Sequence, residues 1–375
     1  IDRVVVAGCM VQKYGAELAA EIPEVDHFLG LDELEKAPAA ALGLPSLPRF
    51  TAKPLATRLY DDLAPRVLTG RRGYAYLKVA EGCNNPCTFC TIPQMRGLQR
   101  SRSVASLVRE AQALEAQGVS ELVLISQDTT RYGEDAGLGR EGLATLVAAL
   151  LAETGFPWVR FLYAYPKTLH ESVLELMASE PRFVPYVDIP LQHVSRGVLA
   201  AMRRGGDAES YARLFEGMRR TVPGIALRST FIVGFPSETE ADFEELLGFV
   251  KAAELDHLGV FPYSPEPGSG AESLGDPVPA EAKAERQSAV MAAQREISRR
   301  KNRALKGKVH EAILEGVSTE SELLLEGRLK RQAPEIDGKL LVNDLPEGFV
   351  PRPGAVVRVK VTEAHDYDLV GRVVA

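Results

Sequence analysis

The stretch AEGCNNPCTFCTIPQMRG, residues 80–97, holds three of the four cysteines in a chain of 375 residues. They are Cys83, Cys87 and Cys90, and their spacing is Cys-x3-Cys-x2-Cys. Glycine, asparagine and proline lie among them, which indicates an exposed loop rather than a chance group of buried cysteines. A cluster of this kind, in a chain otherwise poor in cysteine, predicts a metal-binding loop and not a disulfide framework.

Three cysteine ligands without a fourth favour one kind of metal group. A structural zinc site needs four ligands, and the nearest histidines, His27 and His170, are far from the motif in sequence. A 4Fe–4S cluster can instead be held by three thiolates, with one iron left open. S-adenosylmethionine (SAM) can chelate that iron, and an electron from the cluster then breaks its S–C bond. The deoxyadenosyl radical so formed can remove hydrogen from an unactivated carbon.

A regular alternation of strands and helices surrounds the motif. Six apolar runs predict strands, each followed by a helical pattern, at residues 75–80, 121–126, 158–164, 186–190, 225–235 and 257–264. This pattern implies a parallel sheet covered by helices, either open or partly closed as a barrel. The cysteine motif follows the first strand and so falls at the carboxyl end, where such folds carry their sites.

Other segments flank this array, whose predicted span is residues 71–277. Residues 1–30 read as part of an α/β layer, and residues 31–70 hold five prolines and little periodicity, which predicts a linker. Residues 278–304 predict a long connecting helix. Residues 305–375 contain about five short strands separated by turn residues, which indicates a small β-barrel of the oligonucleotide-binding type.

Composition narrows the class of protein. The formal net charge of −7 argues against bulk nucleic-acid binding and is compatible with a basic protein partner. No apolar run is long enough to cross a membrane, and the first residues do not form a signal peptide. Four cysteines without a disulfide pattern indicate a reducing compartment, so we expect a cytoplasmic protein.

Several segments together resemble the radical SAM methylthiotransferases. They are the cysteine motif, LISQDTT (124–130), DIPLQHVS (188–195), MRRGG (202–206) and TFIVGFPSETEADFEE (230–245). The resemblance covers nearly the whole chain. It implies an α/β fold with a partial (βα)6 barrel of radical SAM type, a remnant of an N-terminal methylthiotransferase α/β domain, and a C-terminal TRAM β-barrel. It also implies a transferase that uses a 4Fe–4S cluster and SAM to add a methylthio group.

Two further segments, APEIDG (333–338) and EAHDYDLVG (363–371), are similar to the RimO type, which modifies a ribosomal protein. From Leu305 to the end the chain carries 10 Lys and Arg and 12 Asp and Glu, a net charge of −2. A domain that grips tRNA is expected to be basic, whereas a mildly acidic one suits a basic protein. Asp366 and Asp368 are expected to be exposed acids of this kind; the alternative is a turn that fixes the barrel, with these carboxylates capping local N–H groups.

The resemblance then implies a substrate, ribosomal protein S-twelve, with the β-carbon of one aspartate as the target, and it implies an electron donor as a further partner. Two alternatives stay open. One is a tRNA methylthiotransferase of the MiaB type, which would make nucleic acid the partner. The other is a non-catalytic RNA-binding module with a structural metal.

Cys9, in VVVAGCMVQKYG, resembles the third ligand of a second 4Fe–4S cluster that the family carries on its N-terminal domain. The other two ligands are expected upstream of Ile1. Because one thiolate cannot hold a 4Fe–4S cluster, we expect this chain to support one cluster. Without the resemblance, Cys9 reads as a buried structural cysteine.

Four residues near the first two strands are expected to contact the cofactor. Phe89, before the last cysteine of the motif, is expected to pack beside the adenine of SAM. Ser126, Gln127 and Asp128 end the second predicted strand, where radical SAM proteins contact the methionine amino group. The alternative for these three is helix capping or turn chemistry.

Three more candidates lie on or directly after the fourth and fifth predicted strands. Gln192, with His193 beside it, is expected to line the mouth of the array, although a lone histidine is more often structural. Arg228 is expected to meet the carboxylate of SAM, or else an internal Asp or Glu. Gly234 is expected to let the backbone approach the cofactor, or to serve only a turn. The two arginines of MRRGG are expected on solvated surface.

Overall fold

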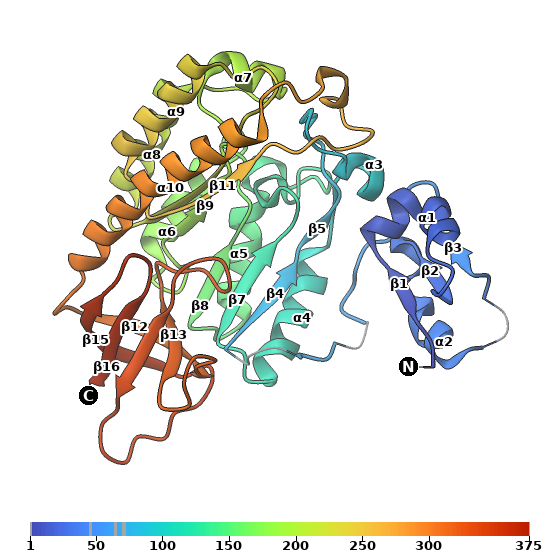
Figure 1. Ribbon diagram of the computed structural model, residues 1–375. Coiled ribbons are helices and arrows are strands. Elements are labelled where there is room, and N and C mark those ends of the chain that lie inside the picture. Colours follow the sequence, from blue (N-terminus) through green and yellow to red (C-terminus); the bar gives the residue numbers. More distant parts are fainter. Residues whose placement is uncertain (1, 45–46, 64–65, 70–72, 375) are drawn as a thin grey trace.

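The structure is a computed structural model that describes residues 2–44, 47–63, 66–69 and 73–374. Figure 1 shows three parts: a central α/β core, a small N-terminal layer at one side, and a C-terminal barrel below the core. No helix within the described residues is both long enough and apolar enough to span a membrane.

Six parallel strands form the core. They are β4 (Tyr74–Lys78), β7 (Glu121–Ile125), β8 (Trp158–Phe161), β9 (Tyr186–Asp188), β10 (Ala226–Val233) and β11 (His257–Pro262). Ladders join β4, β7 and β8, and a second set joins β9, β10 and β11. Backbone hydrogen bonds link the two sets, from Val184 to Val159 (2.9 Å) and from Ala164 to Asp188 (2.8 Å). The six predicted strands are confirmed, and their order makes a partial barrel.

Helices cover the outside of these strands. They are α4 (Val104–Ala116), α5 (Gly142–Glu153), α6 (Glu171–Ser179), α7 (Arg196–Ala201), α8 (Ala208–Thr221) and α9 (Glu240–Ala253), with short 3-10 turns η2 (Thr129–Arg131), η3 (Gly139–Glu141) and η4 (Glu272–Leu274). Asp207 and Thr239 each cap a helix through a capping box, which explains where α8 and α9 begin.

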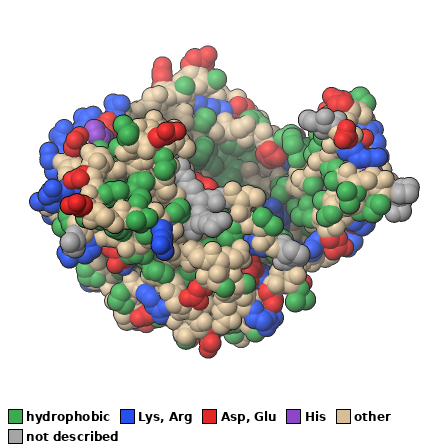
Figure 2. All heavy atoms as spheres, turned by 90° about the horizontal axis from the view of Figure 1, so that it is seen from below, with side chains coloured by type: hydrophobic (Ala, Val, Ile, Leu, Met, Phe, Trp, Pro, Cys, Tyr) green, Lys and Arg blue, Asp and Glu red, His purple; other side chains and the backbone are tan. Residues whose placement is uncertain are grey.

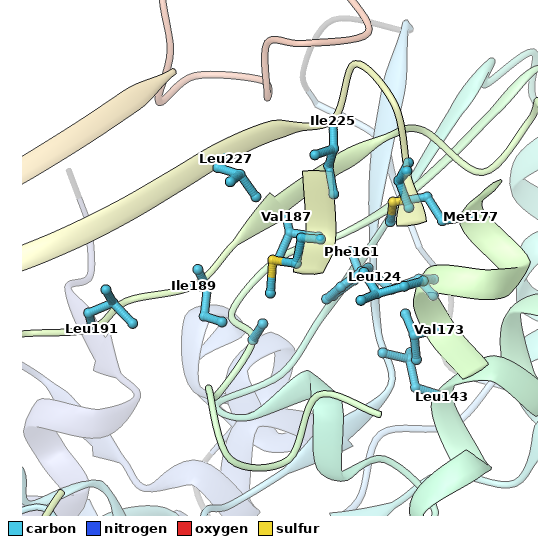
Figure 3. Close-up of a cluster of buried hydrophobic side chains, with 14 of the residues drawn as sticks. Leu124, Leu143, Phe161, Val173, Met177, Val187, Ile189, Leu191, Ile225 and Leu227 are labelled. Atoms are coloured by element: carbon cyan, nitrogen blue, oxygen red, sulfur yellow. The ribbon is translucent and has the colours of Figure 1, made fainter. Parts of the chain in front are cut away.

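The main hydrophobic core lies between the strands and these helices. Figure 3 shows Leu124 and Phe161 from the strands beside Leu143, Val173 and Met177 from the helices. All five side chains are buried. Since each strand is covered by helices on its outer face, apolar residues there stabilise the core by roughly 1.5–3 kcal/mol per large side chain.

The N-terminal layer is built on three parallel strands in the order β1-β2-β3. Its elements are β1 (Val5–Ala7), α1 (Cys9–Glu21), β2 (His27–Leu29), η1 (Leu31–Lys36), α2 (Ala37–Leu42) and β3 (Phe50–Thr51). The layer therefore extends to Thr51, into the region that the sequence analysis assigned to a linker. A two-residue strand among prolines has no periodicity, so only its pairing with β2 reveals it.

The C-terminal barrel follows the long helix α10 (Ala280–Arg303). Five strands close it in the order β12-β13-β14-β16-β15, which confirms the predicted small barrel. They are β12 (Val309–Val317), β13 (Leu325–Leu329), β14 (Leu340–Asp344), β15 (Val356–Ala364) and β16 (Leu369–Val374). The barrel has its own small apolar core, which includes Leu314, Leu340 and Val359.

The C-terminal barrel docks against the amino ends of the core strands. Tyr186, the first residue of β9, donates a hydrogen bond to Asp337 (2.7 Å), and Tyr74, the first residue of β4, donates one to Glu335 (2.6 Å). The segment from Ala333 to Gly338 thus closes one end of the core. The carboxyl ends of the strands, where the cysteine motif lies, face away from the C-terminal barrel.

Candidate active site

The cysteine motif forms a loop with a tied base. The short strands β5 (Ala80–Glu81) and β6 (Arg100–Ser101) pair antiparallel and bracket residues 82–99, here called the cysteine loop, which includes the short helix α3 (Ile92–Arg96). The Cys83 N–H donates to the Gly97 carbonyl (3.1 Å). Gly82 has φ +81°, and a Cβ there would lie 2.2 Å from the Leu98 carbonyl oxygen. Only glycine fits this close return of the chain.

Each sulfur of the motif accepts a hydrogen bond. The donors are the Asn85 N–H to Cys83 (3.4 Å), the Ile92 N–H to Cys90 (3.5 Å) and the Arg204 guanidinium to Cys87 (3.5 Å). Burial raises the pKa of the Cys83 and Cys90 thiols. The donors suit three thiolates on one loop. In the described ranges, however, no three His, Cys, Asp or Glu side chains are arranged as a metal-binding group.

Arg204 is a candidate site residue that sequence reasoning missed. It belongs to MRRGG, whose arginines were expected on solvated surface, but it is partly buried and stacks over the Tyr165 ring at 4.4 Å. Its guanidinium also donates to the Pro190 carbonyl (2.7 Å). It therefore brings a fixed positive charge to Cys87. The signal in the sequence was the resemblance of MRRGG itself, because a basic pair alone does not distinguish the two environments.

The turn after β7 serves mainly to hold the cysteine loop. Asp128 is 1% exposed, accepts a hydrogen bond from the Asn85 side chain (2.8 Å) and another from Thr130 (2.7 Å). The Ser126 hydroxyl accepts from the Asp128 N–H (3.2 Å), which is turn chemistry. Gln127 differs, because its buried side-chain oxygen has no hydrogen-bond partner in the described part of the chain. Of the three, Gln127 retains an acceptor for a ligand.

Gln192 and His193, which follow β9, lie in different environments. Gln192 has φ +74°, and its backbone is fixed by hydrogen bonds with Thr230 (2.8 Å) and Ile232 (2.7 Å) of β10. This strained conformation is typical of a functional position. The His193 side chain is fully buried, 3.4 Å from Glu238, so it does not line the mouth. This burial favours the structural alternative for His193.

Arg228 meets internal carboxylates. Its guanidinium lies 2.8 Å from Asp188 and 3.5 Å from Asp337, the latter from the C-terminal barrel. These pairs agree with the alternative that Arg228 meets an internal Asp or Glu. The guanidinium is already paired and is not left to bind the carboxylate of SAM. Gly234 has φ +73°, and a Cβ there would lie 2.3 Å from the Lys283 side chain. Gly234 therefore lies against α10, and its positive φ serves the turn that follows β10.

Phe89 is partly buried in a small apolar cluster beneath the cysteine loop. Val198, Met202, Phe235 and Tyr263 make up most of that cluster. This packing anchors the loop between Cys87 and Cys90 to α7 and to the segment after β10. Its contact with adenine stays a prediction.

Cys9 lies against the cysteine loop. The Arg96 guanidinium donates to the Cys9 sulfur (2.9 Å) and to Glu81 (2.7 Å), so one arginine joins the N-terminal layer to the core. Lys13 of α1 pairs with Glu266 of the core close by. A cavity of about 270 Å³ lies at this junction, lined by Gly8, Arg96 and other residues. Figure 2 shows the surface hollowed between the N-terminal layer, at the right, and the main body.

Asp366 and Asp368, the two acids that were expected to be exposed on the C-terminal barrel, have hydrogen-bond partners. Asp366 accepts two hydrogen bonds from Arg299 of α10 (2.7 and 3.1 Å), and Asp368 accepts one from the Lys339 N–H (2.7 Å). Both carboxylates have partners, which favours the alternative of a turn that fixes the barrel over a free acidic surface. They hold the last turn of the C-terminal barrel to its neighbours, which a charge count cannot distinguish from a free acidic surface.

Comparison with known proteins shows what the chain is similar to. Residues 77–250 match the radical SAM superfamily, and residues 307–374 match the TRAM domain. A protein of Solibacter usitatus (strain Ellin6076), named ribosomal protein uS12 methylthiotransferase RimO, is 48% identical over 376 residues, which cover 100% of this chain and 79% of that protein. A protein of the same name from Aquifex aeolicus (strain VF5) is 43% identical, over 99% of this chain and 81% of that protein.

A solved structure shares the fold. The radical S-adenosylmethionine methyltransferase TsrM from Kitasatospora setae superposes with a TM-score of 0.54 at 17% sequence identity. The match covers 72% of this chain and 58% of TsrM.

Proposed function

The chain belongs to the RimO family of radical SAM methylthiotransferases, and we propose that it adds a methylthio group to the β-carbon of an aspartate in ribosomal protein uS12. It is a SAM-dependent transferase, and its cofactors are a 4Fe–4S cluster and SAM. The observation that carries the proposal is the cysteine loop, which presents Cys83, Cys87 and Cys90 at the carboxyl end of the core strands.

We assign the cluster to these three cysteines. When bound, the cluster and SAM supply a carbon-centred radical that removes hydrogen from the substrate. The residues of this chain prepare the place where that happens. The β5–β6 pair fixes the base of the cysteine loop, Arg204 supplies positive charge to Cys87, and Asp128 holds the loop through Asn85.

Gln127 is the residue that we assign to SAM itself. Its side-chain oxygen is buried without a partner in the described part of the chain, and it follows β7 beside the cysteine loop. An amide oxygen in that position accepts a hydrogen bond from an ammonium group, such as that of the methionine part of SAM. Burial of an acceptor costs free energy until it is paired, so binding of SAM is favoured there.

We propose Cys9 as one ligand of a second 4Fe–4S cluster in the N-terminal layer, and the hydrogen bond from Arg96 to its sulfur, which brings it beside the cysteine loop, supports this. Two partners complete the proposal. One is a one-electron donor, since the cluster must be reduced. The other is the basic ribosomal protein, which enters at the carboxyl ends of the strands. We further propose that the protein works in the cytoplasm, where its cysteines stay reduced.

Anaerobic reconstitution with iron and sulfide tests the function. The loaded protein, given SAM and dithionite, should release 5′-deoxyadenosine, and a variant with Cys83→Ala, Cys87→Ala and Cys90→Ala should release none. Cys9→Ala is the matched control, because it removes a cysteine outside the motif and should leave SAM cleavage intact. Mass spectrometry of uS12 and of tRNA, incubated separately, identifies the substrate.

Three results would count against the proposal. Release of 5′-deoxyadenosine by the triple variant would remove the assignment of the cluster. Methylthio groups found on tRNA, with uS12 unmodified, would favour the MiaB type of activity. A colourless protein that holds zinc tightly would favour the non-catalytic alternative.

A further inference from the structure

A second cavity lies at the amino ends of β9 and β10, on the side of the core away from the cysteine loop. It has a volume of about 620 Å³. Basic side chains from four separate segments line it: Arg219 of α8, Lys301 of α10, His310 of β12, and Lys330 with Arg331 directly after β13. The core, the connecting helix and the C-terminal barrel therefore meet around one space of ligand size.

Positive charge exceeds negative charge in this cavity. Its two carboxylates are Asp256 and Glu311. Lys301 and Arg331 share a single oxygen of Asp256, at 2.9 and 2.7 Å, and Lys330 lies 3.0 Å from Glu311. Arg219 has no carboxylate partner in the described ranges, and its guanidinium donates instead to backbone carbonyls at the end of α9.

This concentration runs against the charge of the whole chain, which is −7. Figure 2 views the molecule from the side of the C-terminal barrel and shows Lys and Arg side chains gathered at the left edge, where Figure 1 places the end of α10. The last turn of α10 contributes Arg300, Lys301 and Arg303. Close cations repel each other, so an arrangement of this kind is stabilised by a bound anion.

An unpaired ring nitrogen inside the cavity also favours a ligand. The Nε2 atom of His310 is buried without a hydrogen-bond partner in the part of the chain that the structure describes. Burial, followed by nearby Arg331 and Lys308, lowers the pKa of His310. A ligand oxygen would both pair this nitrogen and relieve the repulsion.

The rest of the wall is apolar. Pro185, Ile225, Leu305 and Leu329 line it between the charged side chains. An inorganic ion would leave this surface unused, whereas a compound with an apolar body would cover it. We propose that the cavity binds an organic phosphate of about nucleotide size, with the phosphate on the cationic side chains and the body against the apolar wall. The ligand would join the core to the C-terminal barrel, and it is separate from the methylthiotransferase site.

Calorimetric titration with AMP, inorganic phosphate and a short 5′-phosphorylated RNA tests this. The wild-type protein should bind AMP more tightly than inorganic phosphate. Arg219→Gln should weaken AMP binding at least about tenfold, because it removes a cation from the cavity. Arg213→Gln on the same helix is the matched control, since Arg213 is exposed and pairs with Glu209 outside the cavity. Lys330→Gln, from the C-terminal barrel, is a second variant that should weaken AMP binding without touching α8.

The RNA identifies the source of the phosphate. Binding of AMP but not RNA indicates a free nucleotide, and tighter binding of RNA that Arg219→Gln also weakens indicates a strand end. The proposal is overturned if neither AMP nor RNA binds, if inorganic phosphate binds as tightly as AMP, or if Arg219→Gln and Arg213→Gln behave alike. Release of 5′-deoxyadenosine should be the same in all variants.

Discussion

Glu121 offers a direct test of how the C-terminal barrel is held to the core. It is the first residue of β7 and is fully buried. Its carboxylate accepts hydrogen bonds from Arg160 of the core (2.6 Å) and from Arg328 of the C-terminal barrel (2.5 Å). We expect Glu121→Gln, which keeps the shape and removes the charge, to destabilise the junction of the two parts.

The expected loss of unfolding free energy depends on which partners Arg160 and Arg328 retain when the charge of Glu121 is removed. Arg328 retains Glu315 at 2.6 Å, but the two terminal nitrogens of Arg160 already lack partners in the described part of the chain. Without Glu121, Arg160 becomes a buried charge with no counter-charge. Removing one partner of a buried pair costs about 3–5 kcal/mol. Glutamine can still accept a hydrogen bond, so we expect a loss of free energy of unfolding of about 3 kcal/mol.

The assay is urea unfolding followed by tryptophan fluorescence. The chain has one tryptophan, Trp158, and its indole donates to Glu311 of the C-terminal barrel (2.7 Å), so its emission reports on this junction. A loss of about 3 kcal/mol lowers the urea midpoint by about 1 M. The control is Glu209→Gln, an exposed acid on α8 whose loss should cost less than about 0.5 kcal/mol. A midpoint for Glu121→Gln equal to that of the control would refute the reasoning.

Three other outcomes are expected. The free energy of unfolding should fall in acid. Burial raises the pKa of Glu121, but the two arginines outweigh burial and hold that pKa below its usual value. The stability that Glu121 contributes is therefore present above the unfolded pKa of about 4.3 and is lost as pH falls through the folded pKa. Urea midpoints measured down the pH scale should therefore drop for the wild type and change less for Glu121→Gln. Gly82→Ala should abolish iron binding in a colorimetric assay, because its Cβ would strike a backbone carbonyl. Gly118→Ala is the control and should keep iron, since Gly118 is also at positive φ but has open space around it. Equal iron content in the two variants would contradict the argument that only glycine fits at position 82. Gln127→Ala should weaken SAM binding in equilibrium dialysis and leave iron content unchanged, and an unaltered affinity would rule out Gln127 as a ligand of SAM.

Much of the core was accessible from sequence because periodic patterns report on single segments. The six strands and the strands of the C-terminal barrel are apolar runs bounded by turns, and the cysteine spacing is a local feature. The position of the site followed from them, since a loop after a parallel strand must lie at its carboxyl end.

The remainder depends on partners that are distant in the chain. Arg228 finds Asp337 more than a hundred residues later, and no pattern near either residue indicates the pair. Arg204 was misjudged for the same reason, because burial and stacking are set by neighbouring elements. For His193 the structure favours the structural alternative, which the sequence could not decide. Asp366 was expected to be an exposed acid, and its ion pair with Arg299 of α10 is not evident from the sequence.

The segment from Ala333 to Gly338 has a consequence for how such proteins can be rebuilt. Its Asp337 and Glu335 reach the tyrosines that start β9 and β4, and Asp337 also lies 3.5 Å from Arg228 inside the core. An exchange of the C-terminal barrel for one without these acids would leave polar groups of the core unpaired. The two domains are therefore not interchangeable modules: a functional chimera must transplant the acidic segment together with the tyrosines and arginine that receive it, and substitutions on either side are expected to need a compensating change on the other.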